Sequence, residues 1–282
     1  MGGVSPAHIF LIGIPPLARS ASDGLFDPSL ALRASGGENY GTTMTSSEST
    51  TTDTPRKGLT AALESSQQRR RSFIDYRHFI QNHYDGLPGA LTAVTGLLTG
   101  HEALAGRLIR PGAFDVRGCK RILDAACGNG RYSRFLLRHA DPDAILTTFD
   151  LSPRMLLRAR ARLKSERVSH AVADLTRLPY ADASFDAIVC GWVLEHLPDP
   201  RLGLRELARV LQPGGKLLLL STEDTLTGAM CSRLWHCRTY NRVELRRVSA
   251  ECGLSWEREM WFSGIHRLLK LGGIIVEMRR QS

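Results

Sequence analysis

The chain has 282 residues, of which 43% are hydrophobic, and it carries a formal net charge of +9 at pH 7. These values fit a soluble globular protein with one good-sized domain and an appendage. No apolar run approaches the ~18 residues of a membrane span, so we expect no transmembrane segment.

The six cysteines form no CxxC pair, which favours a reducing, cytoplasmic location over a disulfide framework. Cys231, His236 and Cys237 lack a fourth ligand at the spacing of a zinc site, so we expect no metal. The basic residues are mostly arginines spread along the chain. We attribute them to a GC-rich genome more than to nucleic-acid binding.

The first part of the chain differs in character from the rest. Residues 1–68 read as a disordered or leader segment, because the stretch 41–55 is almost entirely Ser and Thr. Residues 69–118 follow as an N-terminal helical segment. Its first helix places aromatic and aliphatic side chains at helical spacing before a Gly-Leu-Pro stop. A weaker helical stretch covers 90–109.

From residue 119 to 282, strands and helices alternate, which predicts an α/β domain with a mostly parallel sheet covered on both faces. Ser152 and Asn241 are predicted N-caps, and a QPGGK turn is expected to separate the third helix from the fifth strand. The predicted strands are 121–127, 144–150, 168–174, 185–193, 216–222, 255–262 and 273–280. The predicted helices are 131–140, 152–166, 200–211 and 241–253.

The stretch RILDAACGNGRYS (121–133) reads as a strand, a small-residue turn and a helix start. In open α/β sheets ligands bind outside the carboxyl ends of the strands. Asp150 ends the second predicted strand, where an acid is placed to accept hydrogen bonds from ribose hydroxyls. Asp174 ends the third, next to Leu175, where an acid and a neighbouring amide suit an adenine edge. Together these residues predict a ligand that contains a nucleoside.

Two phosphate-containing ligands fit the turn poorly. The glycines give only G-x-G-x-x-S, with Ser133 where a dinucleotide fingerprint has its third glycine, and no Gly-Lys-Ser/Thr of a P-loop follows. Asp124, near the end of the first strand, would repel a pyrophosphate but would favour a cationic ligand.

Four segments carry a resemblance to a known family: ILDAACGNG, FDLSPRML, VADLTRLPYADASFDAIVCGWVLEHL and ELARVLQPGGKLLLL. In this order and spacing, over residues 120–222, the chain resembles the class I S-adenosylmethionine-dependent methyltransferases. Within that class it resembles the small-molecule group of quinone, lipid and natural-product enzymes. The resemblance implies a Rossmann-like fold with a mostly parallel seven-stranded sheet, an N-terminal helical lid and S-adenosyl-L-methionine as cofactor. One departure is Ala126, where the family usually has glycine.

The resemblance also implies roles for individual residues. Gly128 and Gly130 let the backbone approach the cofactor, and Asp124 either sits near its ammonium or orients the turn. Asp150 binds the ribose, unless it only prepares the following helix cap, and Asp174 reads the adenine edge, unless it only caps a turn. The remaining expected cofactor contacts are Ala126, Leu151, Met155, Leu175 and the backbone of Cys190.

The reacting end of the site is predicted from the segment after the fourth strand. His196 is a candidate base and Glu195 a candidate orienting group, although such Glu-His pairs also hold the cofactor or the helix start in similar enzymes. Aromatic side chains in the helical lid, at the end of the fourth strand and in the insert after the fifth strand suggest a flat, apolar or lipid-like small-molecule acceptor. These candidate acceptor contacts are Tyr76, Tyr84, Trp192 and Trp235.

Two other functions stay open at this point. GNGRY resembles the turn of wobble-uridine tRNA methyltransferases, although no separate RNA-binding module is visible and the nucleic-acid signal is weak. The chain also fits a non-catalytic domain that binds the cofactor or a partner. The sequence does not indicate an oligomeric state.

Overall fold

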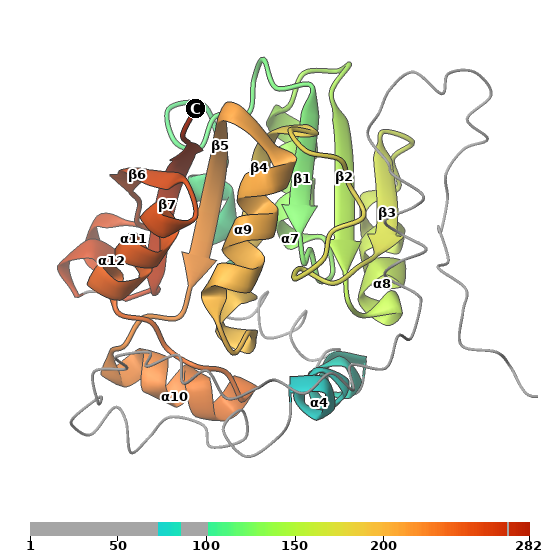
Figure 1. Ribbon diagram of the computed structural model, residues 1–282. Helices are drawn as coiled ribbons and strands as arrows, with labels where there is room; N and C mark the ends of the chain where they lie inside the picture. Colours follow the sequence, from blue (N-terminus) through green and yellow to red (C-terminus); the bar gives the residue numbers. More distant parts are fainter. Residues whose placement is uncertain (1–72, 86–100, 270) are drawn as a thin grey trace, which may run out of the picture.

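The computed structural model describes residues 73–85, 101–269 and 271–282. The predicted leader or disordered segment 1–68 and the first part of the helical stretch 90–109 lie outside the described residues. The described residues form a seven-stranded sheet in the order β3-β2-β1-β4-β5-β7-β6 (Figure 1). The strands are β1 (Arg121–Ala125), β2 (Ile145–Asp150), β3 (Val168–Val172), β4 (Phe185–Gly191), β5 (Leu211–Ser221), β6 (Leu254–Glu259) and β7 (Ile274–Arg280).

The sheet is mixed, with a parallel part and an antiparallel edge. β1 to β5 pair in parallel, whereas β7 runs antiparallel to both β5 and β6. The chain order reverses at β1, which has β2 on one side and β4 on the other. The mostly parallel, seven-stranded Rossmann-like fold predicted from the sequence is therefore confirmed, and the turn after β1 lies at the point where such sheets bind ligands.

Each strand boundary that differs from the prediction does so by a few residues, and two of the differences bear on the site and the sheet. β3 ends at Val172, so Asp174 lies two residues beyond the strand. The QPGGK segment does not separate helix from strand but is a bulge inside β5. Leu211 pairs with Phe185, and the register resumes only at Lys216 with Ala187, because the intervening residues loop out of the ladder. A positive φ of 73° at Gly214 permits this path.

The predicted helices form, and their start signals act as expected. Ser152 accepts a hydrogen bond from the amide of Met155 at 3.0 Å, and Asn241 accepts one from Val243 at 2.8 Å. The predicted helices are α4 (Phe73–Asp85), α6 (His101–Leu108), α7 (Arg131–His139), α8 (Pro153–Leu163), α9 (Pro200–Val210) and α11 (Arg242–Glu251).

Three further helical segments were not predicted: α10 (Leu226–Trp235), α12 (Gly264–Leu268) and the 3-10 turn η1 (Leu194–His196). Both α10 and α12 begin with a hydroxyl cap, from Thr225 and Ser263 respectively. α12 and η1 are too short to show helical periodicity, and α10 leaves several apolar side chains exposed, so its sequence has no clear polar face.

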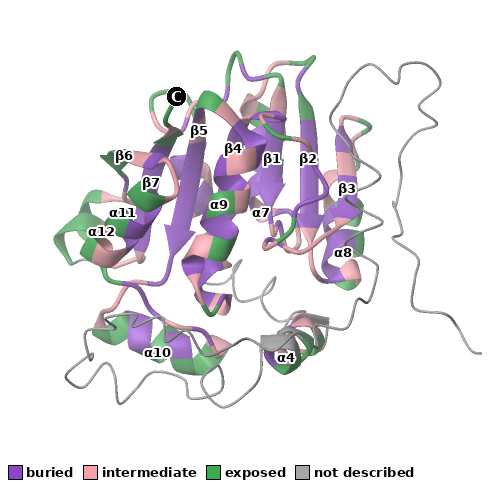
Figure 2. Cartoon of the chain, in the orientation of Figure 1, coloured by how far each residue is buried: buried purple, intermediate pink, exposed green. Residues whose placement is uncertain are grey.

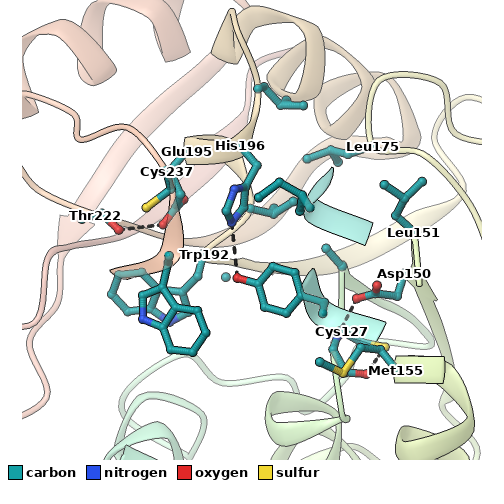
Figure 3. Close-up of a pocket in the computed structure, with 18 of the residues that line it drawn as sticks. Cys127, Asp150, Leu151, Met155, Leu175, Trp192, Glu195, His196, Thr222 and Cys237 are labelled. Atoms are coloured by element: carbon teal, nitrogen blue, oxygen red, sulfur yellow. Dashed lines mark hydrogen bonds between the residues drawn. The ribbon is translucent and has the colours of Figure 1, made fainter. Parts of the chain in front are cut away.

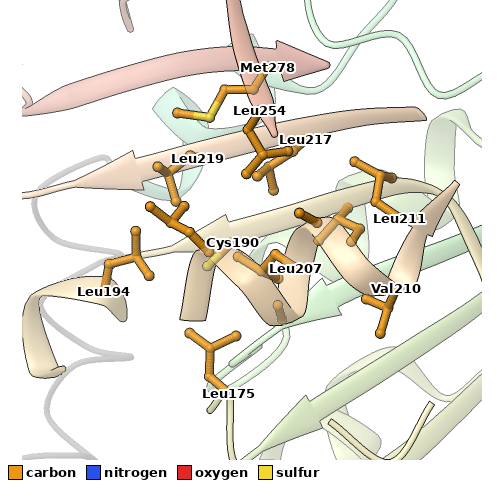
Figure 4. Packing of buried hydrophobic residues seen from close by; sticks show 14 of the residues in the cluster. Leu175, Cys190, Leu194, Leu207, Val210, Leu211, Leu217, Leu219, Leu254 and Met278 are labelled. Atoms are coloured by element: carbon orange, nitrogen blue, oxygen red, sulfur yellow. The ribbon is translucent and has the colours of Figure 1, made fainter. Parts of the chain in front are cut away.

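The core consists of two apolar layers, one on each face of the sheet. One layer joins β4, β5 and β7 to α9 and α11, and Figure 4 shows Leu207, Leu217 and Met278 within it. The other joins β1, β2 and β5 to α6 and α7 through residues such as Phe114 and Leu136. Figure 2 shows the central strands buried along most of their length. Among the described helices, none has the length and apolar character needed to cross a bilayer.

Candidate active site

The turn between β1 and α7 has a left-handed backbone at three positions. Ala126 has a φ of 53°, Gly128 of 54° and Gly130 of 76°. A Cβ at Gly128 would project into open space, so this glycine leaves a cradle on the cavity side of the turn. A Cβ at Gly130 would lie 3.3 Å from the Ala159 Cβ, so this glycine permits close packing of α7 on α8.

Asp124 supports the turn from below and does not line the cavity. Its carboxyl group is buried, and the hydroxyl of Ser133 donates a hydrogen bond to Oδ2. Burial raises the pKa of this carboxyl to about 7. The serine that replaces a dinucleotide fingerprint glycine therefore links β1 to α7, a role that the sequence analysis missed.

Asp150 at the end of β2 holds the turn and the next helix together. Its Oδ2 accepts a hydrogen bond from the amide of Gly128 at 2.8 Å, and its Oδ1 accepts one from the amide of Ser152 at 2.8 Å. The carboxylate also lines the cavity. Both interpretations of Asp150 are compatible with this geometry, because a carboxylate oxygen accepts more than one hydrogen bond.

Asp174 likewise shapes its own turn and faces the cavity. Its Oδ1 accepts hydrogen bonds from the amide and the hydroxyl of Thr176, both at 2.9 Å. The side chain of Leu175 beside it is buried and lines the same cavity.

One cavity of about 580 Å³ connects these residues with the aromatic side chains of α4 and α10. In Figure 3, Asp150, Leu151 and Met155 gather at one end, and Glu195, His196 and Thr222 at the other. We call these the nucleoside end and the acceptor end. The predicted site residues that line the cavity are Tyr76, Tyr84, Ala126, Gly128, Asp150, Leu151, Met155, Asp174, Leu175, Trp192, Glu195, His196 and Trp235.

Three predicted residues lie outside that lining. Asp124 and Gly130 support the turn, and Cys190 is fully buried in the core layer shown in Figure 4. The next residue, Gly191, takes its place in the cavity wall. Gly191 also packs tightly, because a Cβ there would lie 2.8 Å from the Tyr132 ring.

α4 bridges the two ends of the cavity. At the nucleoside end, Gln81 donates a side-chain hydrogen bond to the Leu151 carbonyl at 3.3 Å, and Arg158 donates one to the Tyr84 carbonyl at 3.3 Å. At the acceptor end, the Tyr76 hydroxyl donates to the His236 carbonyl at 2.6 Å. The position of Gln81 was not predicted, because nothing in the helix sequence distinguishes it from a solvent-facing residue.

The hydrogen bonds around His196 indicate its tautomer. Since the Tyr76 hydroxyl donates its proton to a carbonyl, its oxygen accepts from His196 Nδ1 at 2.9 Å. The Nε2 atom then remains an acceptor, and it faces the Tyr84 hydroxyl at 3.4 Å. Burial lowers the pKa of His196 to about 4, with a smaller contribution from His83. This imidazole is therefore neutral at pH 7.

Glu195, beside it, has the pKa of a base poised at neutral pH. Its carboxyl group accepts hydrogen bonds from Ser221 at 3.1 Å and Thr222 at 2.8 Å. Burial raises its pKa to about 7, although these hydroxyls act in the opposite direction. A general base works best when its pKa lies near the operating pH, a condition that Glu195 meets and His196 does not.

Trp192 occupies a strained position where β4 meets the cavity. Its φ of 60° is unusual for a bulky residue. Its indole donates a hydrogen bond to the Tyr132 hydroxyl at 3.1 Å. Burial raises the pKa of Tyr132 to about 12, so this hydroxyl keeps its proton. Tyr132 also lines the cavity, and sequence analysis assigned it no role.

The residues present fit a phosphate-free nucleoside with a charged amino-acid tail. The cradle at Gly128 admits a close backbone approach, and Asp150 and Asp174 line the same cavity. The wall between them is apolar, from Leu151, Met155 and Leu175. S-adenosylmethionine has this character.

Comparison with known proteins identifies the family. Residues 123–219 match the family described as "Methyltransferase domain". The malonyl-[acyl-carrier protein] O-methyltransferase of Hahella chejuensis is 34% identical over 187 residues, which are 63% of this chain and 66% of that protein. The ubiquinone/menaquinone biosynthesis C-methyltransferase of Desulfotalea psychrophila is 31% identical over 144 residues, 51% of this chain and 58% of that protein. The chain thus spans less than two thirds of either relative's length.

Solved structures share the fold. A chain of the complex between the Haloferax volcanii Trm112 methyltransferase activator and a methyltransferase superposes with a TM-score of 0.57 at 19% identity. The match covers 72% of this chain and 98% of that one. The geranyl diphosphate C-methyltransferase of Streptomyces coelicolor superposes with a TM-score of 0.53 at 15% identity, covering 66% and 82%. Residues 123–219 form a methyltransferase domain of the class I S-adenosylmethionine-dependent type, whose cofactor is S-adenosylmethionine.

Proposed function

We propose that this chain transfers a methyl group from S-adenosylmethionine to a small, flat or lipid-like acceptor at the acceptor end of the cavity. The observation that carries the proposal is the single cavity with a nucleoside end and an aromatic end. When bound, the cofactor supplies an electrophilic methyl group on its sulfonium. Asp150, Asp174 and the Gly128 turn hold the nucleoside, with Leu151, Met155 and Leu175 packed beside it.

The acceptor end suits a flat apolar molecule. The rings of Tyr84 and Trp235 stack at 6.2 Å with an interplanar angle of 5°. Trp192 and Tyr76 line the same space. Aromatic walls of this kind contribute large apolar contact areas with few polar constraints. The names of the relatives, which include quinone and acyl-carrier-protein methyltransferases, agree with such a substrate class.

Glu195 is the proposed base of the reaction. An acceptor hydroxyl or acidic carbon that must lose a proton delivers it to the Glu195 carboxylate, which Ser221 and Thr222 orient. His196 and Tyr84 then position the acceptor, because the neutral imidazole and the phenol are linked at 3.4 Å. α4 acts as a lid over both substrates. Six free cysteines support a reducing compartment such as the cytoplasm.

The test is incubation with methyl-labelled S-adenosylmethionine and a cell extract that is afterwards split into lipid, small-molecule and RNA fractions. We expect label in the lipid or small-molecule fraction. Label in RNA would assign the chain to tRNA modification instead. Binding of the cofactor without label in any fraction would indicate a non-catalytic domain.

A further inference from the structure

Two helices that border the cavity expose apolar side chains to solvent. On α10 these are Leu226, Met230 and Leu234, spaced four residues apart on one face. On α12 and its end they are Ile265, Leu268 and Leu269, which also share a face. All six are more than half exposed, and Figure 2 shows the exposed parts of both helices in green.

The two helices leave the sheet at the same edge. α10 follows β5 and α12 precedes β7, and Ser221 at the end of β5 pairs with Ile274 at the start of β7. The segments that join them to the strands line one cavity, with Thr225 on one side and Gly273 on the other. The exposed apolar residues therefore lie around one end of the cavity.

On α10 the exposed stripe adjoins the cavity wall directly. Thr227, Cys231 and Trp235 line the cavity, and each follows one exposed apolar residue in the sequence. Neighbouring positions on a helix point about 100° apart, so the two stripes lie side by side along α10. The apolar lining of the cavity thus continues onto the outer surface.

The charge of this surface has one sign. Neither α10 nor α12 contains Asp or Glu, and the surrounding stretches 225–241 and 260–273 contain none either. Arg233 and Arg267 are exposed, and neither forms an ion pair with a described residue. Arg247, by comparison, pairs with Glu251 at 2.8 Å. Apolar side chains with unpaired arginines complement an anionic lipid surface.

We propose that the exposed faces of α10 and α12 dock this protein on an anionic lipid bilayer, with the mouth of the cavity toward the membrane. Among the described residues, six apolar side chains stand beside two exposed arginines without an ion pair, and this apolar excess favours a bilayer over an acidic protein, which would offer mainly charged partners. A lipid-dissolved acceptor would then enter the cavity from the bilayer. That consequence rests on the proposed function, whereas docking itself does not require methyl transfer.

The test is co-sedimentation of the full chain with vesicles of mixed phosphatidylglycerol and phosphatidylcholine, and with vesicles of phosphatidylcholine alone. We expect stronger binding to the mixed vesicles. The double variant Leu234→Glu/Leu268→Glu should bind them at least about tenfold more weakly, since two inserted side chains become charged. Leu157→Glu on α8, where the leucine is similarly exposed, is the matched control and should bind as the wild type does.

Circular dichroism and cofactor affinity check that the double variant is folded, because neither leucine lines the cavity. Equal vesicle binding by the double variant and the wild type would overturn the proposal. Failure of the wild-type protein to co-sediment with either type of vesicle would overturn it as well. If the wild-type protein is a dimer that does not bind vesicles, and the double variant is a monomer, the face would be assigned to a second copy of the chain. Binding of a purified acidic carrier protein in place of vesicles would assign it to a protein partner. Methyl-transfer activity enters none of these readouts, so failure here is separate from failure of the proposed function.

Discussion

At the scale of single residues, two non-glycine residues with a strained, left-handed backbone lie at the cavity. Ala126 and Trp192 both hold left-handed backbone that their side chains disfavour. They directly follow β1 and β4, the two strands at the reversal of the sheet order. Such outliers persist where the surrounding structure imposes them, and they cluster at functional sites. Here the left-handed backbone at these two positions accompanies the placement of Gly128 and Trp192 in the wall of the same cavity.

Replacing Ala126 with glycine should relieve strain without altering the site. Glycine adopts a φ of 53° freely but loses more backbone entropy on folding. We therefore expect a free energy of unfolding that is unchanged or raised by up to about 1 kcal/mol. Urea denaturation measures the free energy of unfolding, and calorimetric titration measures the cofactor affinity, which should not change. A loss of stability greater than about 1 kcal/mol would show that the Ala126 methyl group has a packing role.

Gly128→Val should abolish cofactor binding, with a loss of at least about 100-fold, because the side chain fills the cradle. Gly118→Val is the matched control. Gly118 has a φ of 77° and open space around its Cβ, as Gly128 does, but it lies away from the cavity. Both variants should lose stability, and only Gly128→Val should lose calorimetric affinity for S-adenosylhomocysteine. Similar affinities in the two variants would refute the assigned role of the turn.

The pH dependence of activity separates the two candidate bases. If Glu195 accepts the proton, kcat/KM rises as the pH passes through about 7 and then levels off. If His196 were the base, the rise would be complete well below pH 6, since its pKa is about 4. The pKa of Asp124 is also about 7, so a rise near pH 7 does not by itself identify Glu195. If Glu195 is the base, the pH-dependent rise in kcat/KM disappears in Glu195→Gln and persists in His196→Asn. A flat wild-type profile above pH 5 would contradict the assignment to Glu195.

At the scale of elements, α4 is the helix that contacts both ends of the cavity. It contacts the nucleoside end through Gln81 and the acceptor end through Tyr76 and Tyr84. A helix that touches both ends can close over a ligand at one end and tighten the other. This geometry supports the lid interpretation, which stays a prediction.

Removing the lid should weaken cofactor binding as well as acceptor binding. We expect deletion of residues 70–88 to reduce cofactor affinity at least about tenfold. Gln81→Ala, which removes one hydrogen bond, should reduce it about 2- to 10-fold. Asn82→Ala on the exposed side of α4 is the control and should have no effect. Calorimetric titration measures the cofactor affinity of each variant. Unchanged affinity in the deletion variant would refute the role of α4 as a lid.

At the scale of the whole molecule, the cavity couples ligand binding to folding. The wall draws on α4, on the turns after β1 to β5, on α10 and on the segment after α12, so a ligand links segments far apart in the chain. A ligand that binds only the folded state stabilises all of them together.

S-adenosylhomocysteine should therefore raise the thermal midpoint. At about 100 times its Kd the added stability is about 2.7 kcal/mol, which corresponds to several degrees. NAD⁺ at the same concentration should give no shift, because the turn has Ser133 where a dinucleotide fingerprint has its third glycine. Differential scanning fluorimetry makes the comparison, with Gly128→Val as the negative control. A shift with NAD⁺ that equals the shift with S-adenosylhomocysteine would mean that the turn is a dinucleotide site after all.

The sequence alone determined most elements of the domain and identified thirteen of the residues that line the cavity. Strands, helices and caps such as Ser152 follow from local periodicity and side-chain chemistry, which neighbouring residues carry. Residues at the ends of parallel strands converge whatever the packing details, so Asp150 and Asp174 were predictable.

Only the tertiary structure decided what depends on contacts between distant segments. It placed Asp124 against Ser133, set Gly130 against α8 and brought Gln81 to Leu151. It also enclosed Glu195 and His196, which raises the pKa of the glutamate above that of the histidine. It also left the outer stripe of α10 uncovered beside the cavity. Burial and mutual distance set these properties, and neither is encoded in the spacing of residues along the chain.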